Sequence, residues 1–228
     1  MTGPRQLHMP LDLPARLSRA SFVAAPCNET ALAMIESRDW PDGKLLLTGP
    51  EGSGKTHLVH IWRARTQAVL IDGASLLQAD PEALAAETSV AIDDADAIAT
   101  SAQAQQSLFH LHNLLAARGG RLLLAARRPA RDWGLSLADL ASRLQAATHV
   151  ALAPPDDTLL AAVLTKLFAD RQVRIPESLI PFLLARMERS LAFAQVLVAE
   201  LDAEALARKK PISRALAADV MQMSFGFE

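Results

Sequence analysis

The stretch that decides the fold is Gly49-Pro50-Glu51-Gly52-Ser53-Gly54-Lys55-Thr56, which fits the phosphate-loop pattern G-x-x-x-x-G-K-[ST]. The apolar run Lys44–Thr48 before it predicts a buried strand, and residues 57–63 after it predict a helix. Strand, glycine-rich loop and helix is the context that this pattern requires, whereas a glycine-rich turn with an incidental lysine requires neither flank. We therefore expect a nucleoside triphosphate site.

Each residue type in this loop has a chemical reason to be there. Glycines let the backbone turn tightly, so that successive N–H groups point at phosphate oxygens. The following helix adds the positive end of its dipole. The Lys55 ammonium would reach the terminal phosphates, and the Thr56 hydroxyl would bind a magnesium ion. The candidate nucleotide-binding residues of this segment are Gly49, Pro50, Glu51, Gly52, Ser53, Gly54, Lys55, Thr56 and His57.

A second acidic motif follows at Ser89-Val90-Ala91-Ile92-Asp93-Asp94-Ala95-Asp96. An apolar run that ends in carboxylates, at this distance from a phosphate loop, predicts the strand that supplies the magnesium site. We expect Asp93 to hold the ion through water and Asp94 to polarise the attacking water as a general base. The alternative is an exposed turn that happens to carry three carboxylates.

Composition limits the class of protein. The chain has 228 residues, of which 50% are hydrophobic, and a net charge of −2, so it can bury a full core. A near-neutral balance argues against a protein that wraps nucleic acid unaided. A single cysteine, Cys27, excludes an internal disulfide and fits a reducing compartment. With no apolar run near the roughly 20 residues of a membrane helix and no signal peptide, we expect a cytoplasmic location.

Short apolar runs alternate with helical patterns along the first two thirds of the chain. Runs at 68–72, 121–125 and 148–152 join the two strands above, which predicts an α/β fold with a parallel five-stranded sheet flanked by helices. Asn28 is the expected N-cap of a helix that starts at Glu29. After Pro154-Pro155 every pattern is helical, which predicts a small all-helical lid domain. The expected domains are 1–20, an extended segment; 21–153, the α/β domain; and 154–228, the lid.

The N-terminal segment contains Gln6-Leu7-His8-Met9-Pro10-Leu11. Composition alone favours a disordered terminus with chance leucines. A glutamine followed by spaced apolar residues also suits an extended peptide that docks in a partner's hydrophobic groove. A second such pattern lies at residues 222–227, where we expect the phenylalanines to pack on the lid instead.

Taken together, these residues resemble the AAA+ superfamily of P-loop NTPases and, within it, the bacterial replication initiator family DnaA. The resemblance covers nearly the whole chain and rests on the loop Gly49–Thr56, the pair Asp93-Asp94, the segment Leu137–Leu144 and the lid stretch Glu188–Leu191. DnaA proteins carry a helix-turn-helix domain after the lid, and the 228 residues here hold no pattern for one. A DnaA-like core without that domain, with a short glutamine-leucine motif near its N-terminus, resembles the Hda family of DnaA regulators.

The resemblance implies partners and cofactors. Members of this family dock through the N-terminal motif on the DNA polymerase III sliding clamp (beta subunit), which assigns partner contacts to Gln6, Leu7, Met9 and Leu11. They inactivate DnaA by promoting hydrolysis of its bound ATP. ADP or ATP with Mg²⁺ is the implied ligand, and association with the nucleoid and replisome is the implied location. Membrane binding and strong direct DNA binding are not expected, and a homo-oligomer is left open.

Two arginines take roles from the resemblance. Arg143 matches the arginine that is supplied in trans to a partner's γ-phosphate, where a guanidinium neutralises the charge of phosphoryl transfer. Arg189 matches the lid arginine that touches nucleotide at the sensor-2 position. The alternatives are a surface arginine on an amphipathic helix and a solvated arginine at a helix end.

One departure from the superfamily pattern concerns hydrolysis. The fourth strand ends in Leu124-Ala125-Ala126-Arg127, without the small polar residue that orients the attacking water at the sensor-1 position. We therefore expect weak or no intrinsic ATPase activity in a chain that acts mainly as the activator of a partner ATPase. The competing hypotheses are an autonomous ATP-driven motor or helicase loader and a passive adaptor with a vestigial site.

Overall fold

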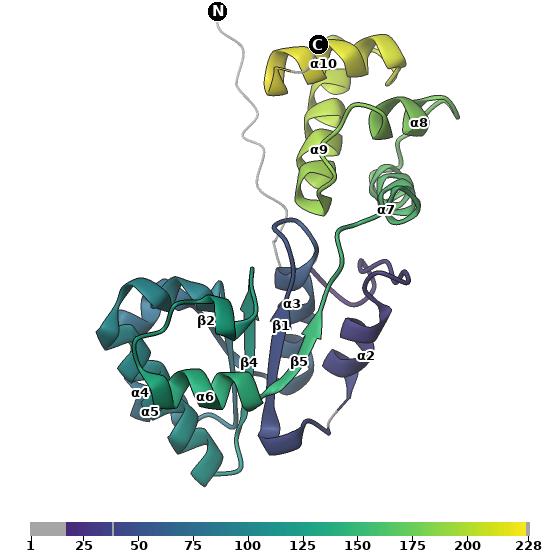
Figure 1. The fold of residues 1–228 in the computed structure, drawn as a ribbon. Coiled ribbons are helices and arrows are strands. Elements are labelled where there is room, and N and C mark those ends of the chain that lie inside the picture. The colour runs from purple at the N-terminus through teal and green to yellow at the C-terminus, as the bar shows by residue number, and fades with distance from the viewer. Residues whose placement is uncertain (1–16, 38, 227–228) are drawn as a thin grey trace, which may run out of the picture.

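The computed structural model describes residues 17–37 and 39–226. Five parallel strands form one sheet in the order β2-β3-β4-β1-β5 (Figure 1). The strands are β1 (Lys44–Thr48), β2 (Val69–Asp72), β3 (Ser89–Asp93), β4 (Arg121–Ala126) and β5 (Thr148–Ala151). This confirms the predicted fold class. The docking residues Gln6, Leu7, Met9 and Leu11 lie outside the described residues and stay a prediction.

Helices cover both faces of the sheet. One face carries α2 (Glu29–Glu36) and α3 (Lys55–Thr66), and the other carries α4 (Pro81–Ala85), α5 (Ala102–Ala117) and α6 (Ala138–Ala146) (Figure 1). Short 3-10 turns connect the elements: η1 (Pro41–Gly43), η2 (Gly73–Leu77), η3 (Ala95–Thr100) and η4 (Ala130–Asp132). Gly119, just past the end of α5, has a φ of +65°, the left-handed conformation that commonly ends a helix.

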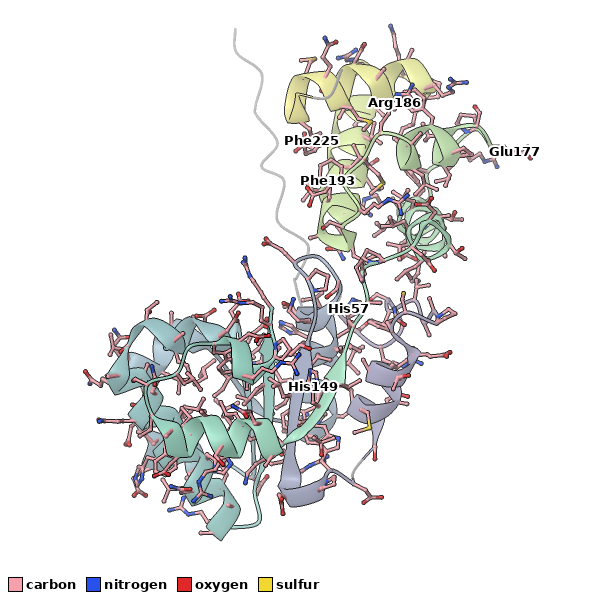
Figure 2. The ribbon with its side chains drawn as sticks, in the orientation of Figure 1. His57, His149, Glu177, Arg186, Phe193 and Phe225 are labelled. Atoms are coloured by element: carbon pink, nitrogen blue, oxygen red, sulfur yellow. The ribbon has the colours of Figure 1, made fainter. Side chains whose placement is uncertain are left out.

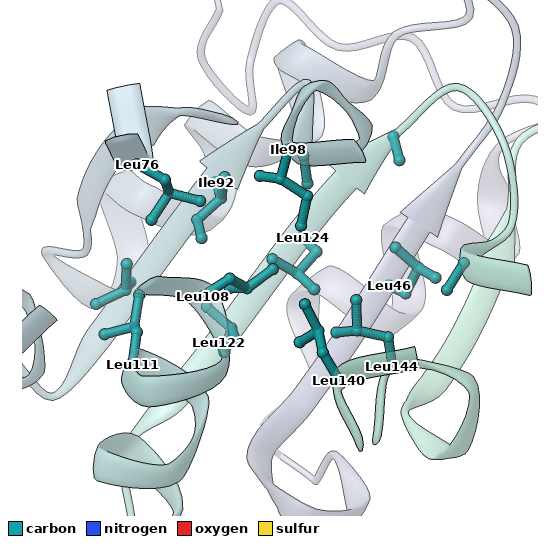
Figure 3. Packing of buried hydrophobic residues seen from close by; sticks show 14 of the residues in the cluster. Leu46, Leu76, Ile92, Ile98, Leu108, Leu111, Leu122, Leu124, Leu140 and Leu144 are labelled. Carbon is teal, nitrogen blue, oxygen red and sulfur yellow. The ribbon is translucent and has the colours of Figure 1, made fainter. Parts of the chain in front are cut away.

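The alternating directions of strand side chains explain why the strands are apolar throughout. In β4, Leu122 and Leu124 pack toward α5 and α6 (Figure 3). Leu123 packs on the other face, toward α2 and α3. Each of these leucines is fully buried, and such burial contributes roughly 1.5–3 kcal/mol per side chain. Burial on both faces is what a parallel sheet between two helical layers requires, and it holds the ends of the strands in fixed positions.

A separate helical layer follows β5. It consists of α7 (Asp157–Asp170), α8 (Leu179–Leu184), α9 (Leu191–Arg208) and α10 (Arg214–Phe225), with its own apolar core. Asp156 caps α7 by accepting the Leu159 N–H at 2.7 Å. Phe225 lies against Phe193 with ring centroids 4.8 Å apart, so its side chain packs on the lid as expected (Figure 2). Phe227, for which the same packing was predicted, lies outside the described residues. No helix in 17–37 and 39–226 has the length and hydropathy of a membrane span.

Asn28 precedes α2 as predicted, but its side chain does not cap the helix. Instead, the Asn28 amide turns back, where Oδ1 accepts the Ala25 N–H at 2.9 Å and Nδ2 donates to the Val23 carbonyl at 3.0 Å. The capping prediction was therefore wrong in its mechanism. The buried Asn28 side chain forms hydrogen bonds with the backbone of the preceding loop. That loop forms part of the wall of the cleft described below.

Candidate functional site

The phosphate loop connects the carboxyl end of β1 to the first turn of α3. Gly52 and Gly54 have φ values of +71° and +100°, a region in which a side chain would be strained. The Gly49 N–H donates to the carbonyl of Ala126 at 3.3 Å, which anchors the start of the loop to the end of β4. The predicted strand, loop and helix are thus present, and the glycines occur where the backbone requires them.

Lys55 begins α3 with its ammonium turned over the loop. Its Nζ donates to the carbonyl oxygens of Gly49 and Pro50, both at 2.9 Å. Burial lowers the pKa of Lys55, although the nearby carboxylates of Asp93 and Asp94 oppose that shift. A buried ammonium on a glycine-rich loop at the N-terminus of a helix is suited to a multiply charged anion such as a phosphate chain.

Thr56 and Asp93 meet across the edge of the sheet. The Thr56 Oγ1 donates to Asp93 Oδ2 at 2.7 Å, although 37 residues separate the two in sequence. A hydroxyl and a carboxylate together form an oxygen donor set of the kind that Mg²⁺ prefers next to phosphates. The loop, Lys55 and this pair therefore fit a magnesium-bound phosphate chain.

Asp94 follows Asp93 in a left-handed conformation, with a φ of +45°. Its backbone N–H donates to Asp93 Oδ1 at 3.1 Å. Desolvation, followed by the charge of Asp93, raises the pKa of Asp94. A carboxylate with a raised pKa is a better proton acceptor, which suits the predicted role of general base.

A cleft of about 1010 Å³ lies between the phosphate loop and the lid helices α7 and α9. Lys55, Thr56, His57 and Asp94 contribute to its floor, and residues 17 and 21–23 form one side. His57 Nε2 lies 2.8 Å from the Ser18 carbonyl oxygen, and its ring meets the Phe22 ring edge-on with centroids 5.1 Å apart. His57 therefore holds the segment before α2 against the loop, and burial lowers the pKa of His57.

Arg143 lies far from this cleft. It is exposed on α6, and its guanidinium stacks over the Phe109 ring of α5 with Cζ 5.3 Å from the ring centroid. Burial lowers the pKa of Lys44, and the nearby positive charge of Arg143 adds to that effect. Lys44 is the first residue of β1, and the strand rise places it about 13 Å from Thr48, where the loop begins. Arg143 acts on Lys44 and belongs to α6, which lies at the end of the sheet opposite the phosphate loop (Figure 1).

Arg189 lies between α8 and α9, but its side chain does not enter the cleft. Its guanidinium is exposed and forms an ion pair of 3.1 Å with Asp157 at the start of α7. Among the described residues, the lid cations that do line the cleft are Lys166 on α7 and Arg171 just after it. Contact between Arg189 and a nucleotide would require exchange of the Asp157 pair, and the sensor-2 role stays a prediction.

The sequence did not point to three features of this site. Arg127, at the end of β4, lines the cleft and pairs with Glu51 of the loop. Phe22 forms part of the wall although it lies before the first predicted helix. Ser190 lies against Gly52, where a Cβ would come within 2.1 Å of the serine Oγ. Only Arg127 carried a usable signal, because it occupies a position where a small polar residue was expected.

No protein-family model matches the sequence. Solved structures, however, share the fold. Domain III of the replication initiation protein DnaA from Thermotoga maritima aligns with a TM-score of 0.81 at 18% identity, over 94% of this chain and 98% of that one. The chain has a DnaA-like AAA+ fold. AMPPCP-bound DnaA from Aquifex aeolicus aligns with a TM-score of 0.73 at 17% identity, over 85% of this chain and 68% of that one.

The same fold extends to a motor protein. The RuvB Holliday junction branch migration motor from Thermotoga maritima aligns with a TM-score of 0.68 at 18% identity, over 90% of this chain and 71% of that one. At this level of identity the similarity establishes the fold, and the activity has to be argued from the site.

Proposed function

We propose that this chain is a regulator of the Hda type, which promotes hydrolysis of ATP bound to DnaA by supplying Arg143 in trans, in complex with the DNA polymerase sliding clamp. The result would be negative regulation of replication initiation. The observation that carries the proposal is the position of Arg143. Its guanidinium is exposed, forms no ion pair within 17–37 and 39–226, and lies at the end of the sheet away from its own loop.

That position suits a residue that acts on another subunit. A guanidinium at the opposite end of the sheet cannot approach a phosphate held by Lys55 of the same chain, but it can be presented to a partner's nucleotide. Arginines supplied in this way accelerate hydrolysis by roughly 10³–10⁵ in other phosphoryl-transfer systems. The stacking on Phe109 holds the side chain on the surface without occupying its N–H donors with a carboxylate.

The chain's own site is proposed to bind ADP or ATP with Mg²⁺. The loop amides and Lys55 would hold the phosphates, and Thr56 with Asp93 would hold the ion, which would neutralise phosphate charge. Structures with the same fold include an AMPPCP-bound DnaA. Nucleotide in the cleft would touch both the loop and the lid, so it would set the position of the lid.

The test is hydrolysis of ATP preloaded on DnaA, with and without this protein, in the presence of sliding clamp loaded on DNA. We expect acceleration by the wild type. Arg143→Ala should abolish it by removing the trans guanidinium, and Gln6→Ala should abolish it by removing the clamp contact. Arg118→Ala is the matched control, since Arg118 is also an exposed arginine, follows α5 and pairs with Glu82. Acceleration that survives in Arg143→Ala would overturn the proposed mechanism.

An autonomous ATP-driven motor or helicase loader is the second candidate. It is favoured by the close approach of four residues of the types that a hydrolytic nucleotide site uses: Lys55, Thr56, Asp93 and Asp94. It predicts brisk ATP turnover by the isolated chain, whereas the first proposal predicts little. Measuring turnover without any partner separates the two.

A further inference from the structure

An ion pair joins the end of β4 to the phosphate loop. Arg127 Nη1 lies 3.1 Å from Glu51 Oε2, and both residues line the cleft. The exposed fractions are 56% for the arginine side chain and 78% for the glutamate, so both groups are accessible to a ligand that enters.

Two hydrogen bonds hold the backbone around Arg127 beside the loop. The preceding residue, Ala126, accepts the Gly49 N–H at 3.3 Å, and the Arg127 N–H donates to Asp96 Oδ1 at 3.4 Å. Arg127 therefore starts next to the first residue of the loop. Its positive charge acts to lower the pKa of Lys55, and it opposes the rise in the pKa of Asp94 that desolvation causes.

The two cations on the sheet side of the cleft have different partners. Among the described lining residues, Lys55 is held by neutral carbonyls of the loop, and Arg127 is held by a carboxylate. An exposed ion pair contributes little stability, because both ions keep much of their hydration. A guanidinium that binds a phosphate through two parallel N–H donors gains more, so a phosphate group competes well against Glu51.

We propose that Arg127 binds the terminal phosphate of this chain's own nucleoside triphosphate, exchanging Glu51 for it, and thereby makes the site select triphosphate over diphosphate. The inference rests on the nucleotide site of the proposed function. It assigns Arg127 as a specificity-determining residue and Glu51 as the competitor that holds the guanidinium in place until a third phosphate is present.

The experiment is calorimetric titration of the full chain with Mg²⁺-ADP and with Mg²⁺-AMPPCP, which is not hydrolysed. Arg127→Ala should weaken AMPPCP binding by about tenfold or more and change ADP binding by less than about threefold. Glu51→Gln should tighten AMPPCP binding a few-fold, because it removes the competing carboxylate, and this gain should vanish in the double variant. Arg128→Ala is the matched control, since Arg128 is an adjacent exposed arginine outside the cleft lining.

The outcomes separate this inference from the proposed function. Equal losses for both nucleotides in Arg127→Ala, or no loss at all, would overturn the assignment of the terminal phosphate, as would a wild type that binds neither nucleotide. Suppose instead that triphosphate selectivity depends on Arg127 but the chain does not accelerate hydrolysis of DnaA-bound ATP. That result would support this inference and contradict the proposed function.

Discussion

The Leu191 N–H donates to the carbonyl oxygen of Gly52 at 3.0 Å, which places the first turn of α9 directly on the phosphate loop. Ser190, next to it, caps α9 by accepting the Phe193 N–H at 3.2 Å and lies where a side chain at Gly52 would be. The loop that would hold phosphates is therefore also the surface on which the lid rests. A change at Gly52 should be felt in both places.

Gly52→Ala should disrupt this contact. The added Cβ would lie 2.1 Å from Ser190 Oγ, and φ at this residue is +71°, so the strain adds to the clash. We expect a loss of about 1–3 kcal/mol in the free energy of unfolding, about tenfold weaker nucleotide binding and faster protease cleavage around residues 152–156. Denaturant titration, calorimetry and limited proteolysis measure the three effects.

Gly119→Ala provides the control for the backbone term. Gly119 also has a positive φ, +65°, but an added Cβ meets nothing within 4 Å. Gly119→Ala should lower the free energy of unfolding by about 1 kcal/mol through backbone strain alone, with nucleotide binding unchanged. If the two variants behave alike, the contact between loop and lid has no role in binding.

Magnesium should act through the Thr56–Asp93 pair. Chelation with EDTA should weaken triphosphate binding about tenfold or more in the wild type, because the ion would no longer offset the phosphate charge. In Asp93→Asn the affinity should be low and nearly insensitive to EDTA. Asp72→Asn is the matched control, because Asp72 pairs in register with Asp93 on the neighbouring strand and an asparagine can still accept the Ala74 N–H. If EDTA weakens triphosphate binding by Asp93→Asn as much as by the wild type, Asp93 is not part of the magnesium site.

Stability should fall as the pH falls below about 6.5, in part because of His112. Burial lowers the pKa of His112 to about 4, and the positive charges of Lys44 and Arg143 contribute. The unfolded chain, with a histidine pKa of about 6.5, binds the proton first, so stability is complete above that pH and is lost as the pH falls toward 4. His112 alone accounts for up to about 3 kcal/mol across this window.

His112→Leu should flatten part of that slope. Denaturant titrations of both proteins at pH 7 and pH 5 measure the effect. A residual slope is expected in the variant, since burial also lowers the pKa values of His57, His60 and His149. An unchanged difference between pH 7 and pH 5 would show that His112 is not protonated on unfolding.

Local patterns were sufficient for the sheet and for the centre of the site. The Thr56–Asp93 contact follows because parallel strands end at the same edge of a sheet. The first turn of the helix after β1 therefore meets the carboxylate at the end of β3. The Arg127–Glu51 pair, the Ser190–Gly52 contact and the Asn28 side-chain bonds depend on how distant segments pack, and no periodicity encodes them. For the same reason the motif at Arg189 could not indicate its pairing with Asp157.

A substitution at Gln105 should displace Arg143 while leaving the arginine itself in the sequence. The Gln105 side chain is buried on α5, and its Oε1 accepts the Ser136 N–H, the Ser136 hydroxyl and the Leu137 N–H at 3.0–3.1 Å. These three bonds hold the residues that lead into α6, the helix that carries Arg143. Gln105→Leu leaves three donors without their acceptor, which should cost about 2–4 kcal/mol in the free energy of unfolding.

Because the start of α6 would lose its anchor, we expect activation of DnaA-bound ATP hydrolysis by Gln105→Leu to fall at least about tenfold. The chain's own nucleotide affinity should stay within about twofold of wild type, since Gln105 lies outside the cleft lining. Gln105→Glu, which keeps the acceptor oxygens and loses the N–H donated to Ala99, should retain more activation than the leucine variant. If the leucine variant folds and activates fully, the anchoring of α6 does not position Arg143.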